Sequence, residues 1–128
     1  MKLAALPILA CLLAGCATHV EIQDHVRTLR SGSFAESRQA GKTVLAGPEF
    51  AYGASKGQII GSLGQPDYET EDGNSVCFKT RGGPLWFTFQ DNQLIYKAIV
   101  SPPRWRGTDA ELAKFWEQQS KMDTWYQW

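Results

Sequence analysis

Residues 52–100 set the strongest limits on the fold, because a short helix pattern is followed there by three strand patterns. Ser55 and Gln58 form a capping box, in which two side chains satisfy backbone N–H groups at a helix start. Three apolar residues then recur at helical spacing: Ile59, Ile60 and Leu63. Gly64 permits the left-handed turn that closes a helix, and Pro66 prevents its continuation. The sequence therefore predicts a helix that begins after Ser55 and ends before Gly64.

Three alternating patterns come next and predict strands over 75–80, 85–90 and 94–100. Gly82-Gly83 and Asp91-Asn92 are the expected turns, because these residue types tolerate positive φ. The second strand points Leu85, Phe87 and Phe89 to one face, and in the third Leu94, Tyr96, Ala98 and Val100 alternate with Ile95, Lys97 and Ile99. One face of such a sheet needs an apolar cover, which the preceding helix supplies. We predict an α+β fold in two layers, with short helices packed on a three-stranded antiparallel meander.

Two motifs in this stretch carry a resemblance to a known family. The first is Tyr-Gly-x-Ser-Lys-x-x-Ile-x-x-x-Leu-Gly-x-Pro, from Tyr52, and the second is Trp-Phe-Thr-Phe-Gln-Asp-Asn-Gln-Leu, from Trp86. Together they resemble the SmpA/OmlA/BamE family of small outer-membrane lipoproteins, although Asn92 stands where that family usually has Gly. The resemblance implies helices on a three-stranded sheet and a role in envelope integrity or β-barrel assembly. β-Lactamase-inhibitor-like modules share this layout, so the resemblance constrains fold better than function.

The first fifteen residues predict a lipoprotein signal peptide. A positive start at Lys2 is followed by an apolar run, 3–13, that is too short to span a bilayer as a mature helix. The run ends in Leu13-Ala14-Gly15-Cys16, which resembles a lipobox, so we expect Cys16 to carry the lipid, palmitate included. Cys11 as the lipidated residue would leave a much shorter apolar run. An ordinary secretory signal or a buried helix is the alternative. Ala17, where similar lipoproteins retained at the inner membrane have Asp, favours the periplasmic face of the outer membrane.

The rest of the chain divides into 16–50, 51–100 and 101–128. The first segment is expected to be a lipidated tether with short helices: Asp24 caps one that ends near Gly32, and a capping box opens a second that stops at Gly41. Residues 43–46 are either a short strand or a buried linker. The last segment begins with Pro102 and Pro103, and contains an amphipathic helix opened by Thr108 and Glu111. Its expected apolar stripe is Leu112, Phe115, Trp116, Gln119 and Met122.

Composition and motifs argue against several classes of function. Lys plus Arg and Asp plus Glu both number 13, whereas a nucleic-acid surface needs a basic excess. Two histidines, His19 and His25, are too few for a histidine metal site, and the chain lacks a phosphate-binding loop. The acidic loop 67–73 is predicted to be a solvated turn rather than a calcium site. Cys77, mid-strand, is expected to be a small buried residue rather than a reactive thiol. We predict a protein that is not an enzyme and uses no cofactor.

The leading hypothesis is a non-catalytic lipoprotein that binds a protein partner in the cell envelope and the membrane through its lipid. Tryptophan is typical of binding surfaces, so the candidate partner-binding residues are Trp86, Trp105, Trp125 and Trp128. One alternative is an enzyme-inhibitor or immunity module that uses the polar sheet face around Trp86. Another is a structural lipoprotein of a secretion or conjugation machine. The sequence leaves open the partner, the oligomeric state and whether the C-terminal helix covers the sheet.

Overall fold

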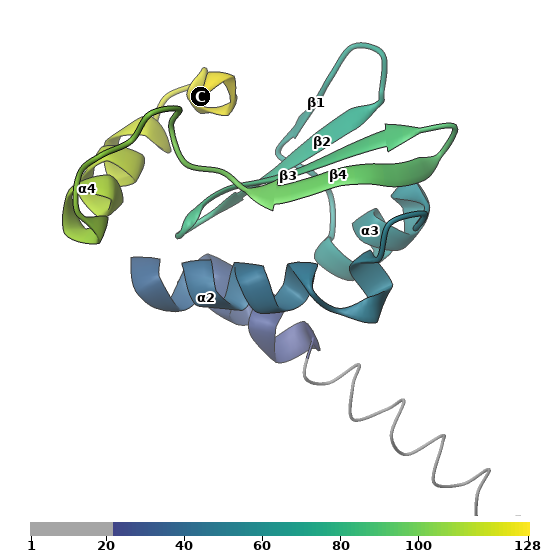
Figure 1. The fold of residues 1–128 in the computed structure, drawn as a ribbon, viewed down its shortest axis with the longest axis horizontal. Helices are drawn as coiled ribbons and strands as arrows, with labels where there is room; N and C mark the ends of the chain where they lie inside the picture. The colour runs from purple at the N-terminus through teal and green to yellow at the C-terminus, as the bar shows by residue number, and fades with distance from the viewer. Residues whose placement is uncertain (1–21) are drawn as a thin grey trace, which may run out of the picture.

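A computed structural model describes residues 22–128 of the chain. Cys16 and the predicted signal peptide therefore lie outside the described residues. The described part has the α+β architecture that the sequence predicts, but its sheet has four antiparallel strands in the order β1-β2-β3-β4 (Figure 1). Along the chain the elements are a helix over 22–31, α2 (Phe34–Leu45), η1 (Pro48–Phe50), α3 (Lys56–Leu63), β1 (Tyr68–Glu69), β2 (Ser75–Thr80), β3 (Gly83–Gln90), β4 (Gln93–Ile99), α4 (Asp109–Gln119) and η2 (Trp125–Gln127).

The two N-terminal helices correct the predicted boundaries. The first is already helical at residue 22, so Asp24 lies within it and does not cap its start. The capping box of α2 is present, with the Ser33 hydroxyl 3.1 Å from the Glu36 amide nitrogen and the Glu36 carboxylate 3.3 Å from the Ser33 amide nitrogen. However, α2 continues through Gly41, and residues 43–45 form its last turn instead of a strand or linker.

Gly41 stays in the helix because it is a packing position. A Cβ atom at Gly41 would lie 2.9 Å from Cδ1 of Ile99 on β4, which is closer than side chains approach each other. The absence of a side chain lets α2 lie close to the sheet at this point. The sequence predicted that the helix stops at Gly41, because a glycine in a helix interior is unfavourable unless packing requires it.

We expect Gly41→Ala to change the free energy of unfolding by less than about 1 kcal/mol, because the end of the Ile99 side chain must move and this cost offsets the gain from alanine. The matched control is Gly57→Ala on α3, where a Cβ would meet nothing within 4 Å. That change should raise stability by about 0.4–1 kcal/mol, because alanine has less freedom than glycine in the unfolded chain. Urea unfolding of both variants measures the difference. Equal effects would show that α2 does not pack tightly on β4.

α3 forms as the sequence predicts, with one difference at its start. The Ser55 hydroxyl accepts from the Gln58 amide at 3.1 Å, but the Gln58 side chain donates to the Glu49 carbonyl at 3.1 Å instead of completing the capping box. Gly64 has a positive φ of 89°, as expected at the helix end, but its ψ of −167° lies outside the left-handed helical region that was predicted. Ile59 and Leu63 are buried on the side that faces the sheet.

The sheet contains one more strand than predicted. β1 pairs with β2, and this places Tyr68 opposite Cys77. Two residues are too few to show an alternating pattern, so only a turn was predicted here. The first hairpin turn is Arg81-Gly82, one residue earlier than predicted, because Thr80 pairs with Gly83. The second is at Asp91-Asn92 as predicted, with φ of 51° and 59°.

A β-bulge changes the predicted faces of β4. Thr88 pairs with Tyr96 but Phe89 pairs with Leu94, so Ile95 has no partner and is exposed. Beyond this extra residue the alternation shifts by one, as expected for a bulge. Ile99 packs on the same core as Leu94, and the prediction that Leu94, Tyr96, Ala98 and Val100 share a face is therefore wrong. Lys97 also faces the helices: its ammonium donates to the carbonyls of Leu45 and Phe50 at 2.5 and 2.6 Å.

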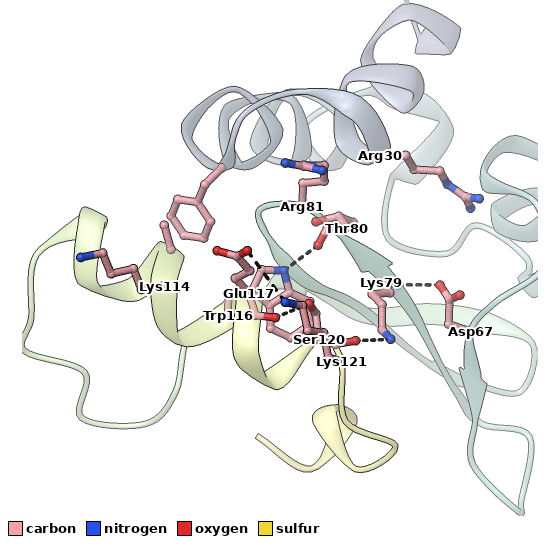
Figure 2. A pocket seen from close by; sticks show the side chains of 12 residues that line it. Arg30, Asp67, Lys79, Thr80, Arg81, Lys114, Trp116, Glu117, Ser120 and Lys121 are labelled. Atoms are coloured by element: carbon pink, nitrogen blue, oxygen red, sulfur yellow. Dashed lines mark hydrogen bonds and ion pairs between the residues drawn. The ribbon is translucent and has the colours of Figure 1, made fainter.

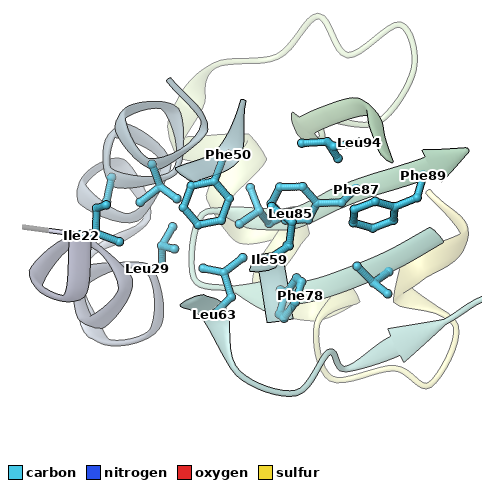
Figure 3. Packing of buried hydrophobic residues seen from close by; sticks show 13 residues of the cluster. Ile22, Leu29, Phe50, Ile59, Leu63, Phe78, Leu85, Phe87, Phe89 and Leu94 are labelled. Atoms are coloured by element: carbon cyan, nitrogen blue, oxygen red, sulfur yellow. The ribbon is translucent and has the colours of Figure 1, made fainter. Parts of the chain in front are cut away.

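The described residues form two cores, one on each face of the sheet, so the prediction of two layers is wrong. The larger core lies between the sheet and the helices that precede it (Figure 3); its members are Ile22, Leu29, Ala40, Val44, Phe50, Ile59, Leu63, Val76, Phe78, Leu85, Phe87, Phe89 and Leu94. The smaller core has Cys77, Trp116 and Trp125 at its centre. In Figure 1, α2 and α3 lie below the sheet, and α4 and η2 lie above it at one end.

Candidate functional site

The C-terminal segment packs on the sheet through α4 and η2. The Thr108 hydroxyl accepts from the Glu111 amide at 3.2 Å and caps α4, as its position in the sequence predicts. Leu112 and Trp116 are buried on one side of this helix. Met122 is 50% exposed because α4 ends at Gln119, so the predicted apolar stripe does not reach it.

Eight aromatic rings, which we call the aromatic cluster, join this segment to the sheet. Its contacts, as distances between ring centroids, are Trp105–Phe115 5.5 Å, Phe115–Trp128 5.4 Å, Trp128–Trp116 4.7 Å, Trp116–Trp125 5.9 Å, Trp125–Tyr126 6.0 Å, Tyr126–Tyr68 3.8 Å and Tyr68–Trp86 6.1 Å. Most of these distances lie in the range that favours offset or edge-to-face packing. Rings far apart in the sequence thus hold α4 and η2 against β1, β2 and β3.

All four tryptophans predicted to bind a partner belong to the aromatic cluster. Trp125 is 5% exposed and is part of the smaller core, so it offers no free surface. Trp86, Trp105 and Trp128 are half-buried, and for them a role in partner binding stays a prediction. The Trp86 indole donates to the Thr88 hydroxyl at 3.3 Å. The indole nitrogens of Trp105 and Trp128 are buried and have no hydrogen-bond partner within residues 22–128.

Cys77 lies at the centre of the smaller core and is fully buried, as predicted. Burial raises the pKa of its thiol, and the negative charge of Asp67 raises it further. The thiol is therefore uncharged at neutral pH, which is the unreactive form of cysteine.

We expect Cys77 to make the protein less stable in alkali. Above about pH 9, the ordinary pKa of the thiol, the unfolded chain loses this proton whereas the folded chain keeps it. The folded state then binds more protons, so stability falls as pH rises, by up to about 1.4 kcal/mol per pH unit. Urea unfolding between about pH 8 and pH 10 should show this loss in the wild type, and a smaller loss in Cys77→Ala. Parallel curves for the two proteins would contradict the assignment.

A hollow lies between α4, the end of β2 and the start of α2 (Figure 2). We call it the basic groove; its volume is about 610 Å³, and its lining consists of Arg30, Phe34, Asp67, Lys79, Thr80, Arg81, Ala113, Lys114, Trp116, Glu117, Ser120 and Lys121. Five of these side chains are cationic and two are anionic. This excess is local, because the whole chain has equal numbers of basic and acidic residues.

Hydrogen bonds between α4 and β2 fix the base of the basic groove. The buried Trp116 indole donates to the Thr80 carbonyl at 2.6 Å. The Lys79 ammonium donates to the Ser120 carbonyl at 2.5 Å and lies 4.9 Å from the centre of the Trp125 ring. On the opposite side of β2, Asp67 accepts from the Lys79 amide at 2.6 Å. The groove is therefore built on ordered structure rather than on loops.

The cations of the groove differ in whether their charged groups have hydrogen-bond or ion-pair partners. Arg30 donates to the Leu63 carbonyl at 2.9 Å, and Lys79 is held as described above. Lys121 lies 4.0 Å from Glu117, but both side chains are more than 70% exposed, so this ion pair is weak. Within the described part of the chain, the charged groups of Arg81 and Lys114 have no hydrogen-bond or ion-pair partner. Several of the groove's cations thus remain available to bind an anion.

Sequence reasoning missed the basic groove entirely. Its cations come from the N-terminal helix, β2, the β2–β3 turn and the C-terminal segment, and most of these parts are far apart in the chain. The only local signals are single lysines and arginines, which are common on any protein surface. The acidic loop 67–73 is a turn only in its second half, because Tyr68 and Glu69 form β1. In the turn, Asp72 accepts from the Thr70 hydroxyl and the Asn74 amide, and these bonds lower its pKa.

Comparison with protein-family models, curated proteins and solved structures finds no match to this chain. The resemblance of residues 52–100 to outer-membrane lipoproteins therefore stays a prediction. Within residues 22–128, no helix is long and apolar enough to cross a bilayer. The same residues contain no group of three or more His, Cys, Asp or Glu side chains placed to hold a metal ion.

Proposed function

We propose that this protein is a lipid-anchored lipoprotein of the bacterial outer membrane that binds a protein partner in the cell envelope and catalyses no reaction. The basic groove is the observation that carries this proposal. It offers cations without partners on a rigid base, which suits electrostatic recognition of another protein. The lipobox ending at Cys16 supports the anchor, and the motifs within 52–100 support a role in envelope integrity or outer-membrane protein assembly.

Crosslinking followed by a pull-down from intact envelopes tests the proposal. The wild type is compared with Cys16→Ala, which removes the predicted lipid site, and with Cys11→Ala as the matched control in the same apolar run. We expect the wild type and Cys11→Ala to capture components of the barrel-assembly machinery, and Cys16→Ala to lose them. Capture of an unrelated machine or of a soluble enzyme would contradict the role in assembly. Equal capture by all three proteins would contradict the role of the anchor.

The inhibitor or immunity alternative draws on a different feature of the structure. A hollow of about 200 Å³ on the outer face of the sheet is lined by Pro84, Trp86, Tyr96, Val100, Tyr126 and Trp128. This alternative needs Trp86 on an open face, but Trp86 is half-buried beside the aromatic residues of the C-terminal tail. The basic groove is larger and carries the charges that a partner would recognise, so we favour it as the binding site.

A further inference from the structure

We propose that the basic groove binds an extended acidic segment of the partner, rich in Asp and Glu. This inference rests on the proposed function, because it names the chemistry of the partner at the same site. The groove gathers five cations from four parts of the chain: Arg30 on the N-terminal helix, Lys79 at the end of β2, Arg81 in the following turn, and Lys114 and Lys121 in and after α4. Clusters of this kind recognise acidic motifs.

The positions of the cations suit an extended chain rather than a single anion. Figure 2 shows Arg30 and Lys114 at opposite ends of the groove, with Arg81 between them on the side of α2. A single small anion would reach only part of this set, whereas carboxylates along an extended peptide would meet one cation after another. Arg81 adds geometric selectivity, because a guanidinium binds a carboxylate through two parallel hydrogen bonds.

The two carboxylates of the groove argue against a uniform polyanion. Asp67 lies beside Lys79, and Glu117 lies on the α4 side with Lys121. Both would repel the closely spaced phosphates of a nucleic acid, which binds to surfaces with a clear basic excess. A peptide can place a neutral or basic residue opposite each of them. Phe34 also lines the groove and offers a half-buried ring to an apolar side chain of the same peptide.

The hollow shape of the groove favours a peptide over a lipid surface as its ligand. A flat bilayer contacts the rim of a groove, but the cations here include Lys79, which is tied to the base through Ser120. A single extended chain can enter between α4 and the end of β2. We therefore assign the groove to a peptide segment and make the lipid headgroup an outcome of the test.

The test measures binding of a fluorescently labelled peptide of alternating Glu and Ser to the full chain in detergent, by anisotropy. The same peptide with Gln in place of Glu is the neutral comparison. We expect only the acidic peptide to bind, and its affinity to fall when salt is raised from about 0.15 M to about 1 M, since the screening length shortens from about 8 Å to about 3 Å.

The groove variant is Arg81→Gln with Lys121→Gln, which removes two charges and leaves the bonds of Trp116 and Lys79 in place. We expect its dissociation constant for the acidic peptide to be about tenfold higher, from the loss of two exposed charge pairs. The matched control is Lys42→Gln with Arg106→Gln, which removes the same charge from exposed positions outside the groove. The control should bind like the wild type.

Three outcomes would overturn the inference. Equal binding of the acidic and neutral peptides would exclude recognition of carboxylates. Equal losses of affinity in the groove variant and its control would show that the peptide is attracted by net charge and binds at no defined site. Stronger competition by glycerol phosphate, the soluble part of an anionic lipid headgroup, than by unlabelled acidic peptide would assign the groove to lipid. None of these measurements depends on the anchor or the envelope, so their failure is distinguishable from failure of the pull-down.

Discussion

Replacing Trp116 with alanine is expected to lower the free energy of unfolding by about 3–5 kcal/mol, the range found for large aromatic residues in cores. Trp116 is 2% exposed, contacts the rings of Trp125 and Trp128, and donates its indole N–H to the Thr80 carbonyl. The substitution leaves a cavity and removes the indole hydrogen bond at the point where α4 meets β2. Urea unfolding followed by tryptophan fluorescence and circular dichroism measures the loss.

Two further variants separate packing from hydrogen bonding at this position. Trp116→Phe keeps an aromatic ring, although a smaller one, and removes the hydrogen bond to the Thr80 carbonyl, which by itself should cost about 0.5–1.5 kcal/mol. Gln118→Ala, at an exposed position of the same helix, should change stability by no more than about 0.5 kcal/mol. A loss below about 1 kcal/mol in Trp116→Ala would mean that α4 does not dock on the sheet.

Removal of residues 123–128 is expected to destabilise the whole domain and to expose the Cys77 thiol. The deletion takes away Trp125, which is buried, and Tyr126, whose ring lies 3.8 Å from that of Tyr68. Together with Cys77 these residues belong to the smaller core. Loss of one large buried aromatic residue costs about 3–5 kcal/mol, a large share of the roughly 5–15 kcal/mol that stabilises a typical domain. Thermal unfolding and the rate of Cys77 reaction with an aromatic disulfide reagent measure the two effects.

The control for this deletion is Gln127→Ala, an exposed position within the removed segment, which should leave both the melting temperature and the thiol unchanged. Trp125→Ala should reproduce most of the deletion's effect. If the truncated chain unfolds at the wild-type temperature and Cys77 stays unreactive, the tail does not belong to the core. Its role as a binding surface, which the sequence suggested, would then be the better interpretation.

Local signals in the sequence predicted the starts of the helices well. Ser33, Ser55 and Thr108 each accept a hydrogen bond from a backbone amide three residues later, as their positions indicated. These signals are reliable because a cap and the backbone amide that donates to it lie within one helical turn. The end of α2 was less predictable, because a distant contact with Ile99 makes glycine favourable at position 41.

The strands likewise combine features that the sequence predicts with a feature that only the structure shows. Their existence and most of their boundaries follow from alternating residues between turns, but the bulge at Ile95 does not. A bulge adds one residue to one strand, so it can be recognised only from the register with its partner. One shifted residue moved Lys97 to the helix side of the sheet, where two carbonyls from the segment 45–50 satisfy its ammonium.

The sequence by itself determined the α+β class, the order of α2, α3, β2, β3, β4 and α4, and the burial of Cys77, because these depend on side-chain periodicity and on caps within a few residues. Only the tertiary structure decided that α4 and the aromatic tail cover the second face of the sheet. It also decided where the basic groove lies, since Arg30, Arg81 and Lys121 meet only after those parts have packed. Contacts between distant segments depend on how apolar surfaces fit together, and the spacing of residues along the chain does not record that fit.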